Sequence, residues 1–210
     1  MNDFLIGQGE TLVCLGDSIT QNDVGYCAML ATLIAASYPQ RDIRVVNAGI
    51  GGDKIPNLLA RLDRDVLARK PDWVTVNVGI NDVWHGLASG GVGGVSLPEY
   101  RAGLETLLDR IAAAGARAVL LPPTVIDEDP GSAGNRALAG YRAAMREAGS
   151  ARGLLIAPTD TDFDAALASG VARWGEPGHT LTSDGVHMRG PGDAVMAVAI
   201  LKTLGFFARS

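Results

Sequence analysis

The chain has 210 residues, of which 47% are hydrophobic and 20% are charged, and its formal net charge is −5. This length and composition are typical of a globular protein with one sizeable core, so we expect residues 1–210 to form a single domain. The sequence has no basic patch that could neutralise phosphates, and we therefore expect no nucleic-acid partner.

Five short apolar runs alternate with longer helical patterns along the chain. The runs are rich in Val, Ile and Leu, as in strands that are buried on both faces of a sheet. In chain order they are Thr11–Leu15, Ile43–Asn47, Trp73–Val78, Ala118–Leu121 and Leu154–Ala157.

Amphipathic stripes lie between these runs and predict helices. They extend from Ile55 to Val66, from Tyr100 to Ile111 and, more weakly, from Leu138 to Ala148, while segment 193–207 is apolar almost all round. Strands separated by helices are joined by right-handed crossovers. The pattern therefore predicts an α/β fold with a five-stranded parallel sheet that is covered on both faces.

Three segments have the composition of long loops, which in compact domains are more often functional than idle. They are the glycine-rich Trp84–Leu97, Pro122–Asn135 and Gly170–Ser183. The second contains the acidic run Asp127–Asp129, which we expect to be solvated.

Polar and glycine residues follow each of the first three predicted strands. Ligands bind beyond the carboxyl ends of parallel strands. We therefore expect Gly16–Thr20, Asn47–Asp53 and Gly79–Asp82 to meet at one edge of the sheet, together with Asp184–His187 from just before the last helix.

These segments supply what ester hydrolysis through an acyl-enzyme needs, namely a hydroxyl, a base, a group that orients the base and donors for the oxyanion. Ser18 is the predicted nucleophile, His187 the base and Asp184 the carboxylate that fixes its tautomer. The backbone N–H groups of Ser18 and Gly52 and the side-chain amide of Asn81 are the predicted oxyanion donors. Ser18 alone is equally suited to cap a helix, so this assignment depends on the four segments together.

Other residues of these segments have predicted supporting roles. Trp84 and His85 are candidates for substrate binding. We expect Asp53 to cap the helix that follows it, and Asp17 and Asp82 to accept hydrogen bonds from loop backbone. No spacing of histidines and carboxylates resembles a set of metal ligands, so neither a metal nor another cofactor is predicted.

The chain resembles the SGNH, or GDSL-type, hydrolases, which are named for a serine, a glycine, an asparagine and a histidine in separate blocks. GDSIT at 16–20, the Gly-Asp pair that ends NAGIGGD at 47–53, GIND at 79–82 and DGVH at 184–187 match these blocks in order. Two positions depart from the family pattern: Ile19 replaces the usual leucine, and Met188 replaces the proline that often follows the histidine. The resemblance implies a three-layer α/β/α, flavodoxin-like sandwich, with Ser18, Asp184 and His187 as triad and Ser18, Gly52 and Asn81 as oxyanion hole.

The sequence thus predicts a serine esterase for small carboxylic esters, with acetyl esters of a sugar as one candidate class of substrate. An acyl thioesterase or a lysophospholipase would use the same triad, with Trp84, Leu87, Val92 and Val95 lining an acyl site. A domain that only binds a nucleotide or a sugar phosphate is the remaining alternative. It is disfavoured because Lys54 stands where the dinucleotide motif has its third glycine.

The amino terminus and the cysteines bear on location. No lysine or arginine precedes the first apolar stretch, so no secretion signal is predicted, and no segment approaches the roughly 18 apolar residues of a membrane span. Cys14 and Cys27 are too few for a disulfide framework, and we expect buried free thiols. These features predict a cytoplasmic protein and leave its oligomeric state open.

Overall fold

The computed structural model describes residues 4–170 and 180–207. Its strands form one parallel sheet in the order β2-β1-β3-β4-β5. The strands are β1 (Thr11–Gly16), β2 (Arg44–Gly49), β3 (Trp73–Asn77), β4 (Arg117–Leu121) and β5 (Leu155–Ile156). The predicted five-stranded parallel sheet is confirmed, and each predicted strand end lies within two residues of the observed one.

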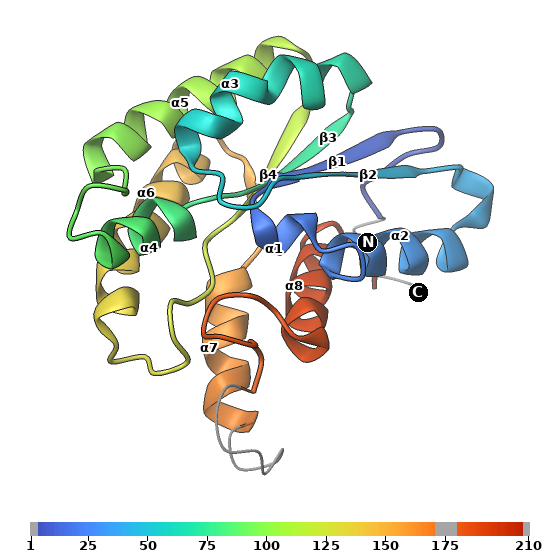
Figure 1. Cartoon of the computed structure of the whole chain (residues 1–210). Coiled ribbons are helices and arrows are strands. Elements are labelled where there is room, and N and C mark those ends of the chain that lie inside the picture. The colour runs from blue at the N-terminus through green and yellow to red at the C-terminus, as the bar shows by residue number, and fades with distance from the viewer. Residues whose placement is uncertain (1–3, 171–179, 208–210) are drawn as a thin grey trace.

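Helices cover both faces of this sheet and make the sandwich three-layered (Figure 1). One face packs against α3 (Ile55–Asp65), α5 (Leu97–Ala113) and part of α6 (Ala133–Ala151). The other face packs against α2 (Tyr26–Ser37), α7 (Thr159–Gly170) and α8 (Gly190–Thr203). The remaining helices are α1 (Ser18–Gln21) and α4 (Ile80–Ala88), with 3₁₀ turns η1 (Pro39–Arg41) and η2 (Leu67–Arg69).

Alternating side chains of the central strands contribute to the hydrophobic core on each of the two faces of the sheet. In β1, Val13 and Leu15 pack against the layer of α3 and α5, whereas Leu12 and Cys14 pack against the layer of α2 and α8. The prediction of burial on both faces is wrong for β2. Because β2 is an edge strand, its Arg44 and Asn47 are exposed.

Local sequence explains where the long helices begin and end. The Ser96 hydroxyl accepts a hydrogen bond from the Glu99 N–H, and the Glu99 side chain accepts one from the Ser96 N–H, which together form a capping box for α5. Gly115 follows α5 with φ of 81°, a left-handed conformation that commonly ends helices. The Ser132 side chain caps α6 by accepting a hydrogen bond from the Asn135 N–H.

Two helices differ from the sequence-based expectation. The predicted loop Trp84–Leu97 begins inside α4, so only its part after Ala88 is loop; the GIND motif marks the first turn of this helix. Helix α7 was not predicted, because its acidic start, TDTDFD, lacks an obvious apolar stripe. Most of the third predicted loop, including residues 171–179, lies outside the described residues.

The strand order reverses direction beside the functional motifs. After β1 the chain crosses to β2 on one side, and it then returns to β3 on the other side of β1. In open α/β sheets, ligands bind at such a point of reversal, beyond the carboxyl ends of the strands. Ser18 follows β1, and Asn81 lies just after β3.

Among the described residues, no helix is long and apolar enough to cross a membrane.

Candidate active site

The structure brings the predicted nucleophile, base and carboxylate into one hydrogen-bonded chain. The Oγ atom of Ser18 lies 2.9 Å from Nε2 of His187. Nδ1 of the same ring lies 2.7 Å from Oδ2 of Asp184. Ser18 and His187 are half-buried, while Asp184 is exposed, so the hydroxyl and the ring are open to a ligand from the solvent side.

The turn that carries Ser18 depends on close backbone packing. A Cβ atom at Gly16 would lie 2.1 Å from the Thr20 Oγ1 atom and 2.9 Å from the Asn77 carbonyl oxygen, so only glycine fits there. Asp17 is the N-cap of α1, and its Oδ1 accepts a hydrogen bond from the Ile19 N–H at 3.0 Å, as predicted. Burial raises the pKa of Asp17 to about 7.

The segment 184–187 forms a tight turn around the Asp184 carboxylate. Its Oδ1 accepts hydrogen bonds from the N–H groups of Val186, at 3.0 Å, and His187, at 2.8 Å. Gly185 has φ of 90°, a conformation that favours glycine. Partial burial acts to raise the pKa of Asp184, but the hydrogen bonds from the His187 backbone and ring and from Val186 outweigh it and lower that pKa. The carboxylate is therefore ionised beside the ring at neutral pH.

Glu128 holds the chain that leads into this turn, although the acidic run 127–129 was expected to be solvated. Its Oε1 accepts hydrogen bonds from the N–H groups of Leu181 and Thr182, both at 2.7 Å, and from the Thr182 hydroxyl at 2.8 Å. Its Oε2 accepts one from the Thr180 N–H at 2.6 Å. Thr182 Oγ1 in turn accepts a hydrogen bond from the Gly185 N–H at 3.1 Å. The prediction is wrong for Glu128, because its partners are more than fifty residues away.

Two of the three predicted oxyanion donors, Gly52 and Asn81, lie in neighbouring segments. Gly52 is half-buried with φ of 79°, so this position is strained for any residue with a side chain. Asn81 is buried in the first turn of α4, and its Nδ2 donates a hydrogen bond to the Asp53 carbonyl oxygen at 3.1 Å. The structure thus links the Asn81 amide directly to the residue that follows Gly52.

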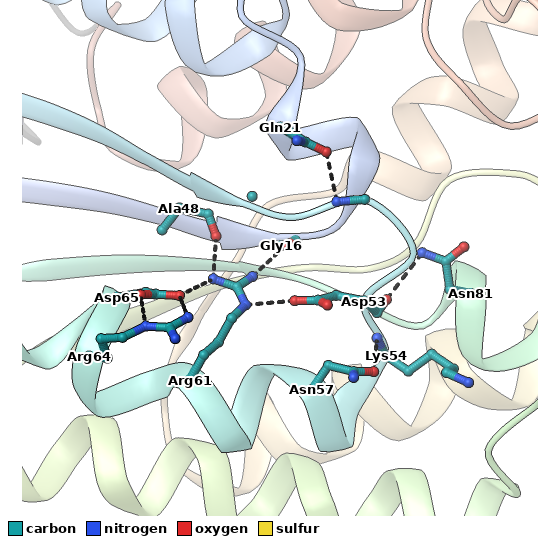
Figure 2. Close-up of polar contacts among 12 residues, drawn as sticks. Gly16, Gln21, Ala48, Asp53, Lys54, Asn57, Arg61, Arg64, Asp65 and Asn81 are labelled. Atoms are coloured by element: carbon teal, nitrogen blue, oxygen red, sulfur yellow. Dashed lines mark hydrogen bonds and ion pairs between the residues drawn. The ribbon is translucent and has the colours of Figure 1, made fainter.

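Of the two aspartates near these donors, Asp53 has a different role from the predicted one and Asp82 has the predicted role. Lys54, rather than Asp53, is the N-cap of α3, and the Asp53 carboxylate binds the Arg61 guanidinium instead (Figure 2). Asp82 accepts a hydrogen bond from the Ile55 N–H at 3.1 Å, so it does bind backbone as predicted. Burial raises the pKa of Asp82 to about 6.

Trp84 and His85 lie beside the candidate triad. The rings of Trp84 and His187 pack edge to face with centroids 5.9 Å apart. A Cβ atom at Gly52 would lie 3.8 Å from Cε1 of His85, so this ring is close to Gly52. Both side chains are half-buried, and their role in substrate binding stays a prediction.

Of the residues proposed for a long acyl site, Trp84 lies beside the candidate triad, but the others do not form a closed site with it. Val92 is 90% exposed, and Leu87 is 49% exposed. A cavity of about 530 Å³ has Leu87 and Val95 in its lining, but neither Ser18 nor His187.

Within the described parts of the chain, no cluster of histidine, cysteine and carboxylate side chains has the arrangement of a metal site.

Comparison with known proteins places these residues in a family. The chain matches the GDSL-like Lipase/Acylhydrolase family over residues 14–195. It is 32% identical to the acetylxylan esterase of Geobacillus stearothermophilus over 217 aligned residues, with 96% of each chain covered. It is also 32% identical to Esterase TesA of Pseudomonas aeruginosa, over 117 residues that cover 53% of each chain.

Solved structures of similar proteins have the same fold. The crystal structure of Axe2, an acetylxylan esterase from Geobacillus stearothermophilus, matches with a TM-score of 0.87 over 96% of this chain and 97% of that one, at 32% identity. Three Axe2 variants described as catalytic mutants, altered at a serine, an aspartate and a histidine, also match. LAE5, an alpha/beta hydrolase enzyme from the metagenome of Lake Arreo, Spain, matches with a TM-score of 0.87 and 30% identity over 96% of this chain and 98% of that one. The chain therefore belongs to the GDSL-like lipase/acylhydrolase family and is a carboxylic ester hydrolase.

Proposed function

We propose that the chain hydrolyses esters of short acyl groups through an acyl-enzyme, with Ser18 as nucleophile, His187 as general base and Asp184 as the group that orients the ring. The observation that carries this proposal is the continuous hydrogen-bonded chain from Ser18 Oγ through the His187 ring to Asp184 Oδ2, with distances of 2.9 and 2.7 Å. The Axe2 variants described as catalytic mutants are altered at the same three residue types, which supports the assignment.

Acylation follows from this geometry. Because ionised Asp184 accepts a hydrogen bond from Nδ1–H of His187, the ring keeps its proton on Nδ1 and its free lone pair on Nε2, which faces the Ser18 hydroxyl. His187 takes the hydroxyl proton as Ser18 Oγ bonds to the ester carbonyl carbon, and the carbonyl oxygen becomes an oxyanion. Collapse of this tetrahedral intermediate breaks the bond to the alcohol oxygen, and the His187 imidazolium returns the proton to the departing alcohol.

Three donors would stabilise the oxyanion: the N–H groups of Ser18 and Gly52 and the second hydrogen on Nδ2 of Asn81. A primary amide nitrogen carries two hydrogens. One of those on Asn81 is donated to the Asp53 carbonyl, which leaves the other for the reacting oxygen. Donors already fixed in place need no reorganisation as charge develops, and each typically contributes a factor of about 10² to 10³ in kcat.

Deacylation repeats the same steps with water as the nucleophile. His187 removes a proton from a water molecule, whose oxygen attacks the acyl carbon and forms a second oxyanion. Collapse breaks the bond to Ser18 Oγ and releases a carboxylic acid, while His187 returns the proton to Ser18. The exposed edge of the Asp184–His187 turn leaves the ring accessible to water.

Acetyl esters of carbohydrates are the substrate class that we propose. The relative that is 32% identical over nearly the whole chain is named an acetylxylan esterase. The exposed positions of Leu87 and Val92 also disfavour a closed acyl site around the nucleophile. A site open to solvent suits a small acyl group on a large polar alcohol.

The first test measures hydrolysis of p-nitrophenyl acetate, butyrate and octanoate by the full chain, and release of acetate from acetylated xylo-oligosaccharides. We expect the rate to fall with acyl length. Ser18→Ala should abolish hydrolysis, and Asn81→Ala should lower kcat about 10²-fold. Ser150→Ala, which alters an exposed serine on α6, serves as the control and should leave kcat unchanged. Undiminished hydrolysis by Ser18→Ala would exclude the mechanism.

The thioesterase and lysophospholipase alternative uses the same triad and is separated by its substrates. Long-chain acyl-CoA and a lysophospholipid should be poor substrates compared with acetyl esters at equal concentration. A kcat/KM that increases with acyl length would favour the alternative and contradict the substrate class proposed here.

A further inference from the structure

Arg61 is a buried cation in the amphipathic helix α3. The residue is 6% exposed, and Figure 2 shows its guanidinium extending from the helix to the carboxyl ends of the strands. Removing a guanidinium from water is costly unless its N–H groups find partners. An apolar side chain would pack at this position without that cost, so packing of α3 does not explain an arginine here.

Arg61 has partners in three segments outside its own helix, in addition to a longer contact of 3.5 Å between its Nη1 and Oδ2 of Asp65 in α3. Its Nη2 donates to the Gly16 carbonyl oxygen at 2.9 Å, and its Nη1 donates to the Ala48 carbonyl oxygen at 2.8 Å. Its Nε donates to Oδ2 of Asp53 at 2.6 Å. Because the guanidinium is planar and rigid, these contacts fix the end of β1, the end of β2 and the loop after β2 relative to one another.

Each of these segments leads to a predicted oxyanion donor. Gly16 lies two residues before Ser18, so its carbonyl fixes the start of the turn that presents the Ser18 N–H. The Gly16 carbonyl also accepts a hydrogen bond from the Ile50 N–H at 3.1 Å, which ties this turn to the segment that contains Gly52. The β1 turn and the β2 loop are thus joined at the atom that Arg61 binds.

Asp53 extends the connection to the third donor. Its side chain is held by Arg61, and its backbone carbonyl accepts the hydrogen bond from Asn81 Nδ2 at 3.1 Å. This hydrogen bond sets the rotation of the Asn81 amide and therefore the direction of its second hydrogen. A shift of Asp53 would move both the Gly52–Asp53 peptide and the Asn81 amide.

We propose that Arg61 is a positioning residue of the oxyanion hole, which holds the segments of Ser18, Gly52 and Asn81 so that their donors meet at one point. This inference rests on the proposed function. Arg61 contacts none of the reacting groups itself and acts through Gly16, Ala48 and Asp53.

The test is Arg61→Lys, with kinetics on p-nitrophenyl acetate. Lysine keeps the positive charge and the ion pair with Asp53, but its single ammonium cannot bind both carbonyls in a fixed plane. Because a displacement of about 1 Å at a reacting centre costs on the order of 10²-fold in rate, we expect kcat to fall between about 10-fold and 100-fold. KM should stay within about twofold, since the oxyanion exists only in the transition state.

A transition-state analogue separates positioning from a general loss of stability. A trifluoromethyl ketone adds to the active serine and forms a tetrahedral oxyanion. Its inhibition constant should rise in Arg61→Lys by the same factor by which kcat/KM falls. A merely destabilised protein would not show this proportionality after correction for the folded fraction.

Arg110→Lys is the matched control. Arg110 also holds α3, through a hydrogen bond from Nη1 to the Leu59 carbonyl oxygen at 2.9 Å and an ion pair with Asp63 at 2.7 Å, but it binds no strand end. We expect kcat and the ketone inhibition constant to be unchanged in this variant. Equal losses of kcat in Arg110→Lys and Arg61→Lys would overturn the proposal.

A second variant covers the case in which Arg61→Lys does not fold. Arg61→Met combined with Asp53→Asn removes both charges, so that no lone charge is buried, and should lower kcat with KM retained. A kcat within about twofold of the wild type in whichever variant is folded overturns the role of Arg61. A wild type that neither hydrolyses the ester nor binds the ketone contradicts the proposed function instead, so the two failures are distinguishable.

Discussion

Replacing Glu128 by glutamine should impair the chain as a catalyst without touching the reacting residues. The Glu128 carboxylate accepts hydrogen bonds from Thr180, Leu181 and Thr182, just before the turn that contains Asp184 and His187. In Glu128→Gln, the amide oxygen can keep the three contacts of Oε1. The amide NH₂ then faces the Thr180 N–H. Both groups are hydrogen-bond donors, so this contact is lost.

The magnitude follows from these contacts. A hydrogen bond to a charged group contributes about 1.5–3 kcal/mol, and neutral bonds contribute about 0.5–1.5 kcal/mol. Glu128 is only half-buried, so solvent reduces the contribution of its charge. We therefore expect Glu128→Gln to reduce the free energy that holds residues 180–182 in place by about 1–2 kcal/mol. If the turn must be ordered for the reaction, this loss corresponds to a fall of about 5- to 30-fold in kcat/KM.

The assay combines kinetics with hydrogen exchange. We expect lower kcat/KM for p-nitrophenyl acetate and faster amide exchange in the peptide that contains residues 180–186. Glu99→Gln is the control, because Glu99 likewise accepts hydrogen bonds, from the N–H and hydroxyl of Ser96, and also has a lowered pKa. That variant should weaken the start of α5 and leave the exchange of residues 180–186 unchanged.

The pH dependence gives an independent measure. Partial burial acts to raise the pKa of Glu128, but hydrogen bonds from Thr180 and Thr182 outweigh it and lower that pKa below the ordinary 4.5. The ionised Glu128 carboxylate thus stabilises the folded state fully above about pH 4.5, and this stabilisation is lost as the pH falls through the lowered pKa. The melting-temperature advantage of the wild type over Glu128→Gln should shrink below pH 4. Unchanged exchange and unchanged kcat/KM at pH 7 would refute the reasoning.

Three further substitutions test individual groups of the site, and a fourth, Gly115→Ala, is a control outside it. Asp184→Asn keeps the acceptor for the turn but places an NH₂ against Nδ1 of His187, which favours the wrong ring tautomer, so kcat should fall on the order of 10³- to 10⁴-fold in the p-nitrophenyl acetate assay. Gly52→Ala places a side chain at φ of 79°, and the control Gly115→Ala places one at φ of 81°. Each should lower the free energy of unfolding, measured in urea, by about 1–2 kcal/mol. Only Gly52→Ala should lower kcat. Asp17→Asn should stabilise the chain by about 2–3 kcal/mol more at pH 8 than at pH 5. Because burial raises the carboxyl pKa from 3.8 to about 7, ionisation destabilises the folded state increasingly across that range, and unfolding at the two pH values measures it.

The sheet could be predicted because its strands are buried and uninterrupted. The predicted runs that became β1, β3 and β4 carry no charged residue and are mostly apolar, as is typical of central parallel strands. Helix α7 escaped prediction because its large apolar residues, such as Phe163 and Leu167, are few and lie in an acidic segment. Its packing against α8 is a property of the assembled layers and has no local signal.

The reacting groups of the candidate site were accessible from sequence for a similar reason. Each lies in a short motif at the end of a strand or in a turn, and the topology brings those ends together. Their assigned roles stay predictions, but their placement is a consequence of parallel strand order. Asp53 shows the limit of such reasoning. An aspartate before a helix is a natural cap, yet its carboxylate turns back to Arg61.

The supporting groups could not be found in this way, because their partners are remote in sequence. Arg61 bonds to a carbonyl 45 residues away, and Glu128 bonds to amides 52 to 54 residues away. By sequence alone, Arg61 is one charged residue of an amphipathic helix, and Glu128 belongs to the acidic run of a loop. In the structure each one joins backbone groups that precede a predicted functional residue: Arg61 before Ser18, and Glu128 before Asp184. Hydrogen bonds to backbone carry no side-chain signature at the partner position, so only the fold reveals them. A site built from four separate segments needs such bonds, since no short motif can fix its own position relative to the other three.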